Sequence, residues 1–500
     1  MSRGRRVLSS SLINAAAGLF SLAAGFGASL IVARLLGVEG SGVVAFALWI
    51  MTAATLVSDF GMPQTALRFI AGNVEPGSSR SSLFAALTKR FVLPTTLATL
   101  GMLGYALLVY MEGDSGSALI WAATAMLFVS YAYSTMSLGA AHGLGQFRDA
   151  AERTLMGSLI QPVAILAGAL LLGPAGAIFG YATRHLPQAL ALRRYLPKGQ
   201  SRDALITPPM KQYARHNWLS GCTSSILGSR VELAIIGLYF SFVDVGYYAV
   251  GVTMSGLVLQ LGMFFVAALV PYFGALHDLN DMAGLTRGYQ GGMRWLAIAL
   301  APICFGGAAI APVLIPSLFG AQFEPGVGSA EVLLASTFPV ALAAVSARML
   351  LARERSLDVL KLSLVLDAAS MLLMLSIIPY FGGLGAAWVK GAVGVLELLT
   401  FLWFCQKRLD IPTIPMDIVK IVAAGVLAGV AARVCILWIP GLGGMALGIA
   451  AGAVVYPACI LLFRALSADD KALLSAWAST YGPARLRQWL PMRDAALERR

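Results

Sequence analysis

The sequence predicts an all-α polytopic membrane protein with about fourteen transmembrane helices. Of its 500 residues, 58% are hydrophobic and only 12% are charged, whereas roughly a quarter of the residues in a soluble domain are charged. The apolar runs are about 18 to 25 residues long, which is the length that an α-helix needs to cross a bilayer. The runs do not alternate apolar with polar residues, so a transmembrane β-barrel is excluded.

The predicted spans follow from the apolar runs between charged residues and Gly/Pro breaks. The first six lie at about 12–33, 42–63, 90–111, 118–141, 154–172 and 175–192. The next six lie at about 215–239, 245–273, 292–314, 330–351, 360–380 and 383–405, and two more at about 418–438 and 442–463. The first run follows a short basic segment but is too long for a signal peptide, so we expect an uncleaved first helix.

The positions of Lys and Arg agree with this count, because cytoplasmic segments should carry the positive charge. Every second gap is basic, and the basic residues include Arg80, Lys89, Arg90, Arg148, Arg153, Arg193, Arg194, Arg287, Arg353, Arg355, Lys407 and Arg408. The opposite gaps carry acids such as Glu112, Asp114, Asp244 and Glu324. The sequence therefore predicts a multi-pass protein of the cell inner (cytoplasmic) membrane with both termini in the cytoplasm.

A polar stretch from Pro197 to Pro209 divides the first twelve spans into two sets of six. We expect five segments: an N-terminal six-helix lobe (1–196), a cytoplasmic linker (197–212), a C-terminal six-helix lobe (213–408), two additional transmembrane helices (409–464) and a cytoplasmic amphipathic tail (465–500).

Weak internal similarity supports the two lobes. Gly42-Val43-Val44-Ala45 before the second span aligns with Gly246-Tyr247-Tyr248-Ala249 before the eighth, and Gly176-Ala177 aligns with Gly385-Ala386. Because each lobe has an even number of spans, the two repeats enter the membrane in the same orientation. This predicts a parallel pseudo-repeat about an axis along the membrane normal.

Several function classes are excluded by what the sequence lacks. The net charge of +12 is distributed as membrane orientation, so no nucleic-acid partner is expected. There is no P-loop and no motif of a hydrolase or metalloprotease, and no aqueous segment is long enough to hold a catalytic domain, so the chain is not expected to be an enzyme. The cysteines and histidines show no metal-ligand spacing, so no metal and no cofactor are expected.

One short motif carries a resemblance to a known family. The chain reads Ala33-Arg34-Leu35-Leu36-Gly37-Val38-Glu39-Gly40-Ser41-Gly42 between the first two spans, and the second span ends Ser58-Asp59-Phe60-Gly61-Met62. This resembles the polysaccharide transporter family, the Wzx-like oligosaccharide-lipid flippases of the multidrug/oligosaccharidyl-lipid/polysaccharide flippase superfamily. The resemblance covers about residues 7–405, and the two last spans depart from the commonest twelve-helix form of the family. A tight turn at Gly37 and a surface anchor at Arg34 also explain these residues without a site.

The resemblance implies a function in assembling exopolysaccharide, capsule or O-antigen lipopolysaccharide. The implied activity is translocation of undecaprenyl-pyrophosphate-linked oligosaccharide repeat units by alternating access. The implied partners are a polyprenyl-pyrophosphate-linked glycan, the lipid bilayer and, in addition, a polysaccharide polymerase and a chain-length regulator.

Charged residues inside the spans are the candidate site residues, because charge in a bilayer is costly and usually lines a path or meets a partner. Counted from the cytoplasmic ends, Arg184 lies roughly 14 Å deep, Arg230 roughly 22 Å and Lys390 roughly 25 Å. With Arg34, these cations are candidates for binding a pyrophosphate group. The acids Glu232, Glu397 and Asp367 are candidates for ion coupling, and a structural ion pair with another helix is an equal alternative for each charge.

Two other functions are left open by the sequence. The first is a gradient-driven drug or small-molecule antiporter of the same superfamily, which fits the fold but fits less well the motif from Arg34 to Gly42. The second is a non-transporting membrane scaffold for envelope assembly, although such a bundle would gain little from buried charges.

Overall fold

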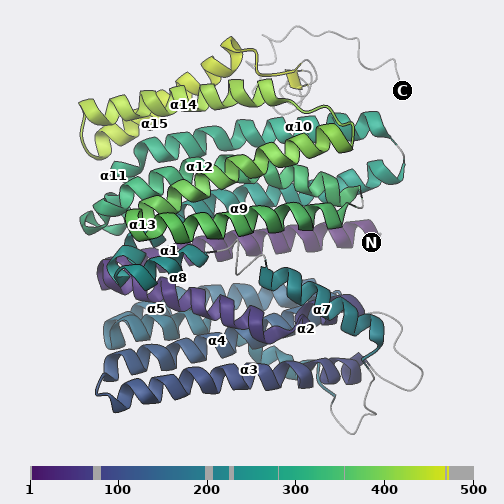
Figure 1. Ribbon diagram of the computed structural model, residues 1–500, viewed down its shortest axis with the longest axis vertical. Helices are drawn as coiled ribbons and strands as arrows, with labels where there is room; N and C mark the ends of the chain where they lie inside the picture. Colours follow the sequence, from purple (N-terminus) through teal and green to yellow (C-terminus); the bar gives the residue numbers. More distant parts are fainter. Residues whose placement is uncertain are drawn as a thin grey trace.

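The computed structural model describes residues 3–70, 80–197, 206–223, 230–279, 281–353, 355–467 and 470–471. These residues form a bundle of helices (Figure 1). Its first half contains α1 (Arg3–Asp59), α2 (Met62–Phe69), α3 (Arg80–Met111), α4 (Ser115–Gly143), α5 (Phe147–Thr183), α6 (Leu186–Leu190) and the 3₁₀ helix η1 (Ala191–Arg194). Its second half contains α7 (Pro208–Thr223), α8 (Val231–Tyr239), α9 (Phe242–Asp278), α10 (Met282–Ala301), the π-helix η3 (Pro302–Gly306), α11 (Gly307–Phe319), the 3₁₀ helix η4 (Ala321–Gly326), α12 (Val327–Ala352), α13 (Ser356–Arg408), α14 (Pro415–Trp438) and α15 (Leu442–Leu462).

The predicted membrane fold is confirmed. Ten helical segments of the described residues are long and apolar enough to cross a membrane. Three of them, α1, α5 and α13, each hold two of the predicted spans, and α7 with α8 occupies the predicted seventh span. The fourteen spans read from the sequence are therefore all accounted for.

The double spans reverse direction at glycine. Gly173 and Gly382 have nearly the same non-helical backbone, with φ/ψ of 59/−138° and 54/−142°. An L side chain rarely adopts this conformation, so glycine permits the tight reversal at both equivalent sites. The predicted spans 154–172 and 175–192, and likewise 360–380 and 383–405, meet at these two points, and the structure confirms both turns.

We group the helices into an N-lobe, a C-lobe and an added pair of helices (Figure 1). The N-lobe contains α1 to α6, and two clusters of buried apolar residues hold it together. The C-lobe contains α8 to α13, and α14 and α15 share its largest buried cluster through residues such as Ile421, Ala424 and Tyr456. The two additional spans therefore extend the core of the C-lobe and do not form a separate body.

The two lobes meet at the turn in the middle of α1 and the start of α9, where the aligned segments of the repeat lie. A Cβ atom added at Gly42 would lie 1.8 Å from the carbonyl oxygen of Phe242. A Cβ added at Gly246 would lie 2.1 Å from the carbonyl oxygen of Val38. The two contacts are reciprocal, since Val38 and Phe242 stand at equivalent places in the two repeats. We call this contact the outer seam, because it lies beside the turns predicted on the outer side.

The seventh span differs from the continuous helix that the sequence predicted. The structure describes α7 and α8 in this span, and Arg230 at the start of α8 has a left-handed backbone with φ 59°, which interrupts a helix. The sequence before the division, Ser220-Gly221-Cys222-Thr223, is rich in residues of low helix propensity. Mean apolarity alone could not reveal this break.

The two halves of the seventh span differ in their main contacts. The indole Nε1 of Trp218 on α7 donates to the carbonyl of Leu56 on α1 at 2.9 Å, and its ring stacks on Phe60 with centroids 4.8 Å apart. The second half, α8, packs against α13 and α9 of the C-lobe and also contacts α1 of the N-lobe. The seventh span therefore joins the two lobes across the molecule.

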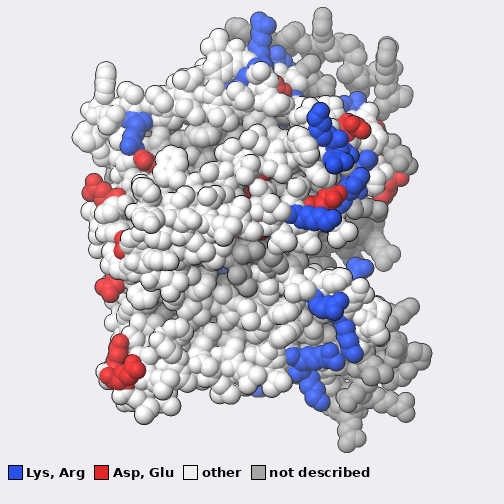
Figure 2. Space-filling model, viewed as in Figure 1, with Lys and Arg blue, Asp and Glu red and all other residues white. Residues whose placement is uncertain are grey.

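Charged residues separate to the two ends of the helices. Figure 2 shows Lys and Arg gathered along one edge and mostly Asp and Glu along the opposite edge of the same face. The first residues of α1 lie at the basic edge (Figures 1 and 2). The amphipathic tail predicted for 465–500 lies almost entirely outside the described residues.

Candidate functional site

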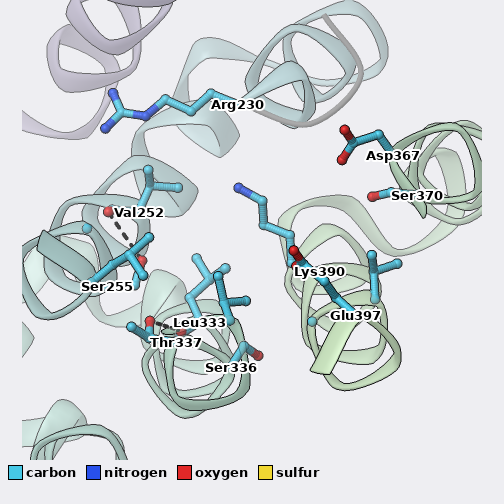
Figure 3. A pocket seen from close by; sticks show the side chains of 15 residues that line it. Arg230, Val252, Ser255, Leu333, Ser336, Thr337, Asp367, Ser370, Lys390 and Glu397 are labelled. Carbon is cyan, nitrogen blue, oxygen red and sulfur yellow. Dashed lines mark hydrogen bonds between the residues drawn. The ribbon is translucent and has the colours of Figure 1, made fainter. Parts of the chain in front are cut away.

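A cavity of about 310 Å³ lies inside the C-lobe, between α9, α12, α13 and the start of α8. We call it the C-lobe cavity. Four of the residues singled out from the sequence line it: Arg230, Asp367, Lys390 and Glu397. Figure 3 shows these side chains around the space, together with the hydroxyls of Ser255, Ser336, Thr337 and Ser370.

Lys390 forms the closest ionic contact of this site. Its Nζ donates to Oε1 of Glu232 on α8 at 2.5 Å. The Glu232 side chain is completely buried, whereas 29% of the Lys390 side chain is exposed and its ammonium points into the cavity (Figure 3). The other carboxylate oxygen of Glu232 is buried and accepts no hydrogen bond within the described residues. The pair thus joins α8 to α13, with the cation on the cavity side.

Arg230 differs from Lys390 in having no partner. Its guanidinium forms no ion pair or hydrogen bond within the part of the chain that the structure describes. In Figure 3 the side chain extends away from Lys390. Because its backbone is left-handed, the side chain leaves α8 in a direction that a continuous helix would not give it. Arg230 is therefore available to an anion at the edge of the cavity.

Two carboxylates face the same cavity from the two spans of α13. Asp367 lies on the first span and Glu397 on the second (Figure 3). Neither carboxylate forms an ion pair among the described residues. The nearby hydroxyls of Ser336 and Thr337 donate to carbonyls of their own helix, at 2.6 and 2.9 Å. The cavity wall thus holds both signs of charge close together.

Arg184 lies elsewhere, inside the N-lobe. Its Nη1 donates to Oε1 of the fully buried Gln161 at 3.4 Å, a long hydrogen bond. The guanidinium also lies against Gly25 of α1, where an added Cβ would be 3.4 Å away. Arg184 therefore belongs to a different region from the four residues of the C-lobe cavity.

Arg34 lies at the outer seam. Its Nε donates to the carbonyl of Leu318 at 2.8 Å, and its Nη2 donates to the carbonyl of Ser317. These carbonyls belong to the last turn of α11, where helices leave acceptors unpaired. The side chain therefore connects α1 of the N-lobe to α11 of the C-lobe.

A second, apolar cavity of about 500 Å³ lies where α14 and α15 meet the C-lobe. It is bordered by η3, whose π-helical turn follows Pro302, and by small residues such as Gly306, Gly448 and Gly452. Proline removes a backbone hydrogen bond and glycine fills no space, so the helices leave a gap here. We call this space the apolar cavity.

The family model for a polysaccharide biosynthesis protein matches residues 31–328, which is more than half of the chain. The chain belongs to this family. The match includes the turn at Arg34 to Gly42, the outer seam and α8, and it confirms the family relationship that the short motif indicated. A search of curated proteins found no match.

Solved structures with the same fold include two kinds of transporter. The lipid II flippase MurJ in an inward closed conformation has a TM-score of 0.70 and 12% sequence identity, covering 91% of this chain and 99% of that chain. A multidrug resistance MATE family transporter of the MOP superfamily in an inward-facing conformation has a TM-score of 0.62 and 14% identity, covering 80% and 95%. At these identities the likeness concerns the fold.

Sequence reasoning missed three ion pairs between the C-lobe and the segments that follow it in the chain. Arg294 on α10 contacts Asp417 on α14 at 3.1 Å and Asp470 at 2.5 Å. Burial raises the pKa of the Asp470 carboxyl, but hydrogen bonds from Ser467 and the adjacent Arg294 lower it overall below its usual value. Arg433 on α14 pairs with Glu331 on α12 at 2.9 Å.

Two of these pairs, Arg294–Asp417 and Arg433–Glu331, fasten α14 to the C-lobe. The signal for Arg433 and Glu331 was present, because each is a charge within a predicted span. Which charges meet across helices could not be read from spacing along the chain.

Proposed function

We propose that this protein flips a polyprenyl-pyrophosphate-linked oligosaccharide across the cytoplasmic membrane, for the assembly of exopolysaccharide, capsule or O-antigen. Membership of a polysaccharide biosynthesis family supports this proposal, as does a two-lobe fold shared with a lipid II flippase. In this mechanism the lobes rock about the outer seam and expose the space between them to each side of the membrane in turn. The protein then acts by transport, without catalysis.

The observation that carries the proposal is the unpartnered guanidinium of Arg230, which lines the same cavity as Lys390. A pyrophosphate group must leave water to cross the membrane, so it needs cations along its path. Arg230 offers a planar set of donors that matches phosphate oxygens, and Lys390 adds a second cation at the cavity. On this proposal Arg184 and Arg34 contact the substrate at other stages of the same path.

The apolar cavity offers a place for the lipid part of the proposed substrate. Its walls are almost entirely hydrocarbon. Small residues of α15 form one part of the wall, and Met254 and Val258 of α9 form another. A polyprenyl chain buried there would remain out of water while the charged group moved between the lobes.

The acids Asp367, Glu397 and Glu232 are proposed to couple transport to an ion gradient. Asp367 and Glu397 face the C-lobe cavity without a cationic partner of their own, so a proton or sodium ion can neutralise them. Glu232 would respond indirectly, since Lys390 can shift from it toward these acids.

The basic and acidic edges of the molecule support an orientation with the start of α1 in the cytoplasm. A polymerase and a chain-length regulator would receive the substrate on the opposite side.

The likeness to a multidrug transporter supports a second candidate, a gradient-driven drug or small-molecule antiporter of the same superfamily. The acids of the C-lobe cavity would suit a cationic drug, whereas the unpartnered Arg230 would repel one. The Arg230 observation therefore favours the flippase.

Deleting the gene and restoring it with variants tests the proposal. In the deletion strain we expect lipid-linked repeat units to accumulate on the cytoplasmic leaflet of the membrane, because they can no longer be flipped. Arg230→Ala should reduce export roughly tenfold or more, because the guanidinium would no longer form a hydrogen-bonded charge contact with the pyrophosphate. The abundance of the variant in the membrane should stay normal, since the guanidinium has no partner among the described residues of the protein. Arg230→Lys is the matched control, with the same backbone strain and the same charge.

Retention of function by Arg230→Lys would indicate that charge suffices, and its loss would indicate bidentate phosphate binding. Normal surface polymer in the deletion strain, combined with increased drug sensitivity, would reject the flippase in favour of the antiporter.

A further inference from the structure

Two adjoining cavities lie at the basic end of the N-lobe. The residues that line them belong to other helices than those around the C-lobe cavity. The first, of about 560 Å³, lies between the starts of α3 and α5 and the end of η1, and three arginines line it: Arg80, Arg153 and Arg194. One acid, Asp149, lines the same space. We call it the arginine cavity. Its lining carries a net positive charge.

The second cavity, of about 490 Å³, runs between α5 and α6. Its walls are mainly apolar and include Met156, Ile160 and Leu190, whose side chains are exposed on the surface of the lobe. We call it the N-lobe groove. Arg153 and Arg194 line both cavities. The two spaces therefore adjoin, with the cations at their common border.

The position of the border matches the headgroup level of a bilayer. Arg153 lies in the second turn of α5, and Arg194 ends η1, so both stand where their spans enter the cytoplasm. Figure 2 shows Lys and Arg gathered at this end of the molecule. The groove residues Met156 and Ile160 follow deeper along α5, on the side of the hydrocarbon core.

The side chain of Arg153 is held in place. Its Nη1 donates to the hydroxyl of Tyr195 at 3.2 Å, and its Nη2 lies 3.6 Å from Asp149. Tyr195 is itself buried and packs edge-on against Phe84. Only 12% of the Arg153 side chain is exposed. By contrast, Arg194 is exposed and has no ion pair within the described residues, so it keeps its full charge for a ligand.

We propose that the arginine cavity and the N-lobe groove form one binding site for an anionic phospholipid of the cytoplasmic leaflet. The phosphate would lie between Arg153 and Arg194, and an acyl chain would fill the groove along α5 and α6. Arginine provides planar donors for phosphate oxygens, and basic pockets beside transmembrane helices favour anionic headgroups. A membrane lipid is the occupant because the groove opens on exposed apolar side chains, which face hydrocarbon in a bilayer. The site stands independently of the transported substrate.

Native mass spectrometry of the full-length protein, stripped of lipid in detergent, tests this site. Phosphatidylglycerol and phosphatidylcholine with identical chains are added separately. We expect phosphatidylglycerol to be retained more strongly than phosphatidylcholine. Arg194→Gln should weaken phosphatidylglycerol binding roughly fivefold, because each cation near the membrane surface contributes about that factor. Arg193→Gln is the matched control, since Arg193 is a neighbouring exposed cation that lines neither cavity.

The groove is tested separately with Ile160→Trp, which fills it without changing any charge. This variant should lower the retention of phosphatidylglycerol and leave the binding of inorganic phosphate unchanged. Arg153→Gln is measured together with thermal stability, because Arg153 also holds Tyr195.

Equal retention of the two phospholipids would overturn the proposal, and so would equal effects of Arg193→Gln and Arg194→Gln. Tighter binding of a polyprenyl phosphate than of phosphatidylglycerol would assign the site to that lipid and also overturn it. Binding of inorganic phosphate as strong as that of the lipid would indicate an adventitious anion site.

Discussion

At the outer seam the two lobes use equivalent residues, whereas inside the membrane they hold their charges in different ways. Gly42 approaches Phe242, and Gly246 approaches Val38, with each contact the counterpart of the other. Inside the lobes the correspondence ends. The N-lobe holds Arg184 by one long hydrogen bond to Gln161. The C-lobe and the helices added to it pair Arg294, Lys390 and Arg433 with acids from other segments of the chain.

The contacts between the lobes are thus repeated, whereas the environments of the charged residues inside the lobes are not. Lobes that move against one another need matching contact surfaces, and a repeated sequence supplies them. A charge inside the membrane needs a partner, water or a ligand. The ion pairs of the N-lobe within the described residues all lie in the first two turns of α5. The charge of Arg184 is therefore balanced by no acid within the described residues, whereas the charge of Lys390 is balanced by Glu232.

The largest expected effect follows from breaking the Lys390–Glu232 pair. Lys390→Ala leaves the fully buried Glu232 without its partner, which should destabilise the protein by ~3 to 5 kcal/mol. Glu232→Gln should cost less, because the ammonium of Lys390 is partly exposed and can reach the cavity. The free energy of unfolding in detergent and the abundance in the membrane measure both effects.

The double variant Lys390→Met with Glu232→Gln is the control, since it removes both charges together. We expect it to recover most of the stability lost in Lys390→Ala. Equal stability of all three variants would mean that the pair is not formed in the membrane.

A smaller effect is expected at the outer seam. Gly42→Ala and Gly246→Ala each place a methyl group within about 2 Å of a backbone carbonyl, so the lobes must separate. Overpacking of this kind destabilises by ~1 to 3 kcal/mol. Because the contacts are reciprocal, the melting temperature should fall by similar amounts in the two variants.

Gly27→Ala is the matched control on α1, since an added Cβ there meets nothing within 4 Å. It should leave the protein unchanged or slightly more stable, because alanine favours a helix. If only one seam variant lowered the melting temperature, the equivalence of the two contacts would be wrong.

Much of the fold could be predicted from the sequence, because each of its signals is local. Span length, the alternation of Lys and Arg, and the turns at Gly173 and Gly382 all depend on neighbouring residues. The alignment of Gly42 with Gly246 even indicated the pair that forms the outer seam.

The arrangement of the candidate site could be predicted only in part. Depth in the membrane singled out Arg230, Lys390, Asp367 and Glu397, and the structure brings these four together. Depth could not show that Lys390 meets Glu232, since the partner comes from another helix. The left-handed backbone at Arg230 was also hidden, because the run around it is apolar enough for an unbroken helix.

The smallest effect on stability is expected for Arg184→Ala. The variant loses one hydrogen bond of 3.4 Å and leaves no acid unpaired, so the free energy of unfolding should change by less than ~1 kcal/mol. Removing a charge from the membrane interior offsets part of even that loss. Gln161→Leu is the control, because it removes the partner and retains the cation.

If Arg184 serves the substrate, Arg184→Ala should reduce export at unchanged abundance, whereas Gln161→Leu should retain most of the export. Export that falls only in proportion to abundance in both variants would instead make Arg184 a structural residue, and the two lobes would then differ in how they bind charge but not in what the charge does.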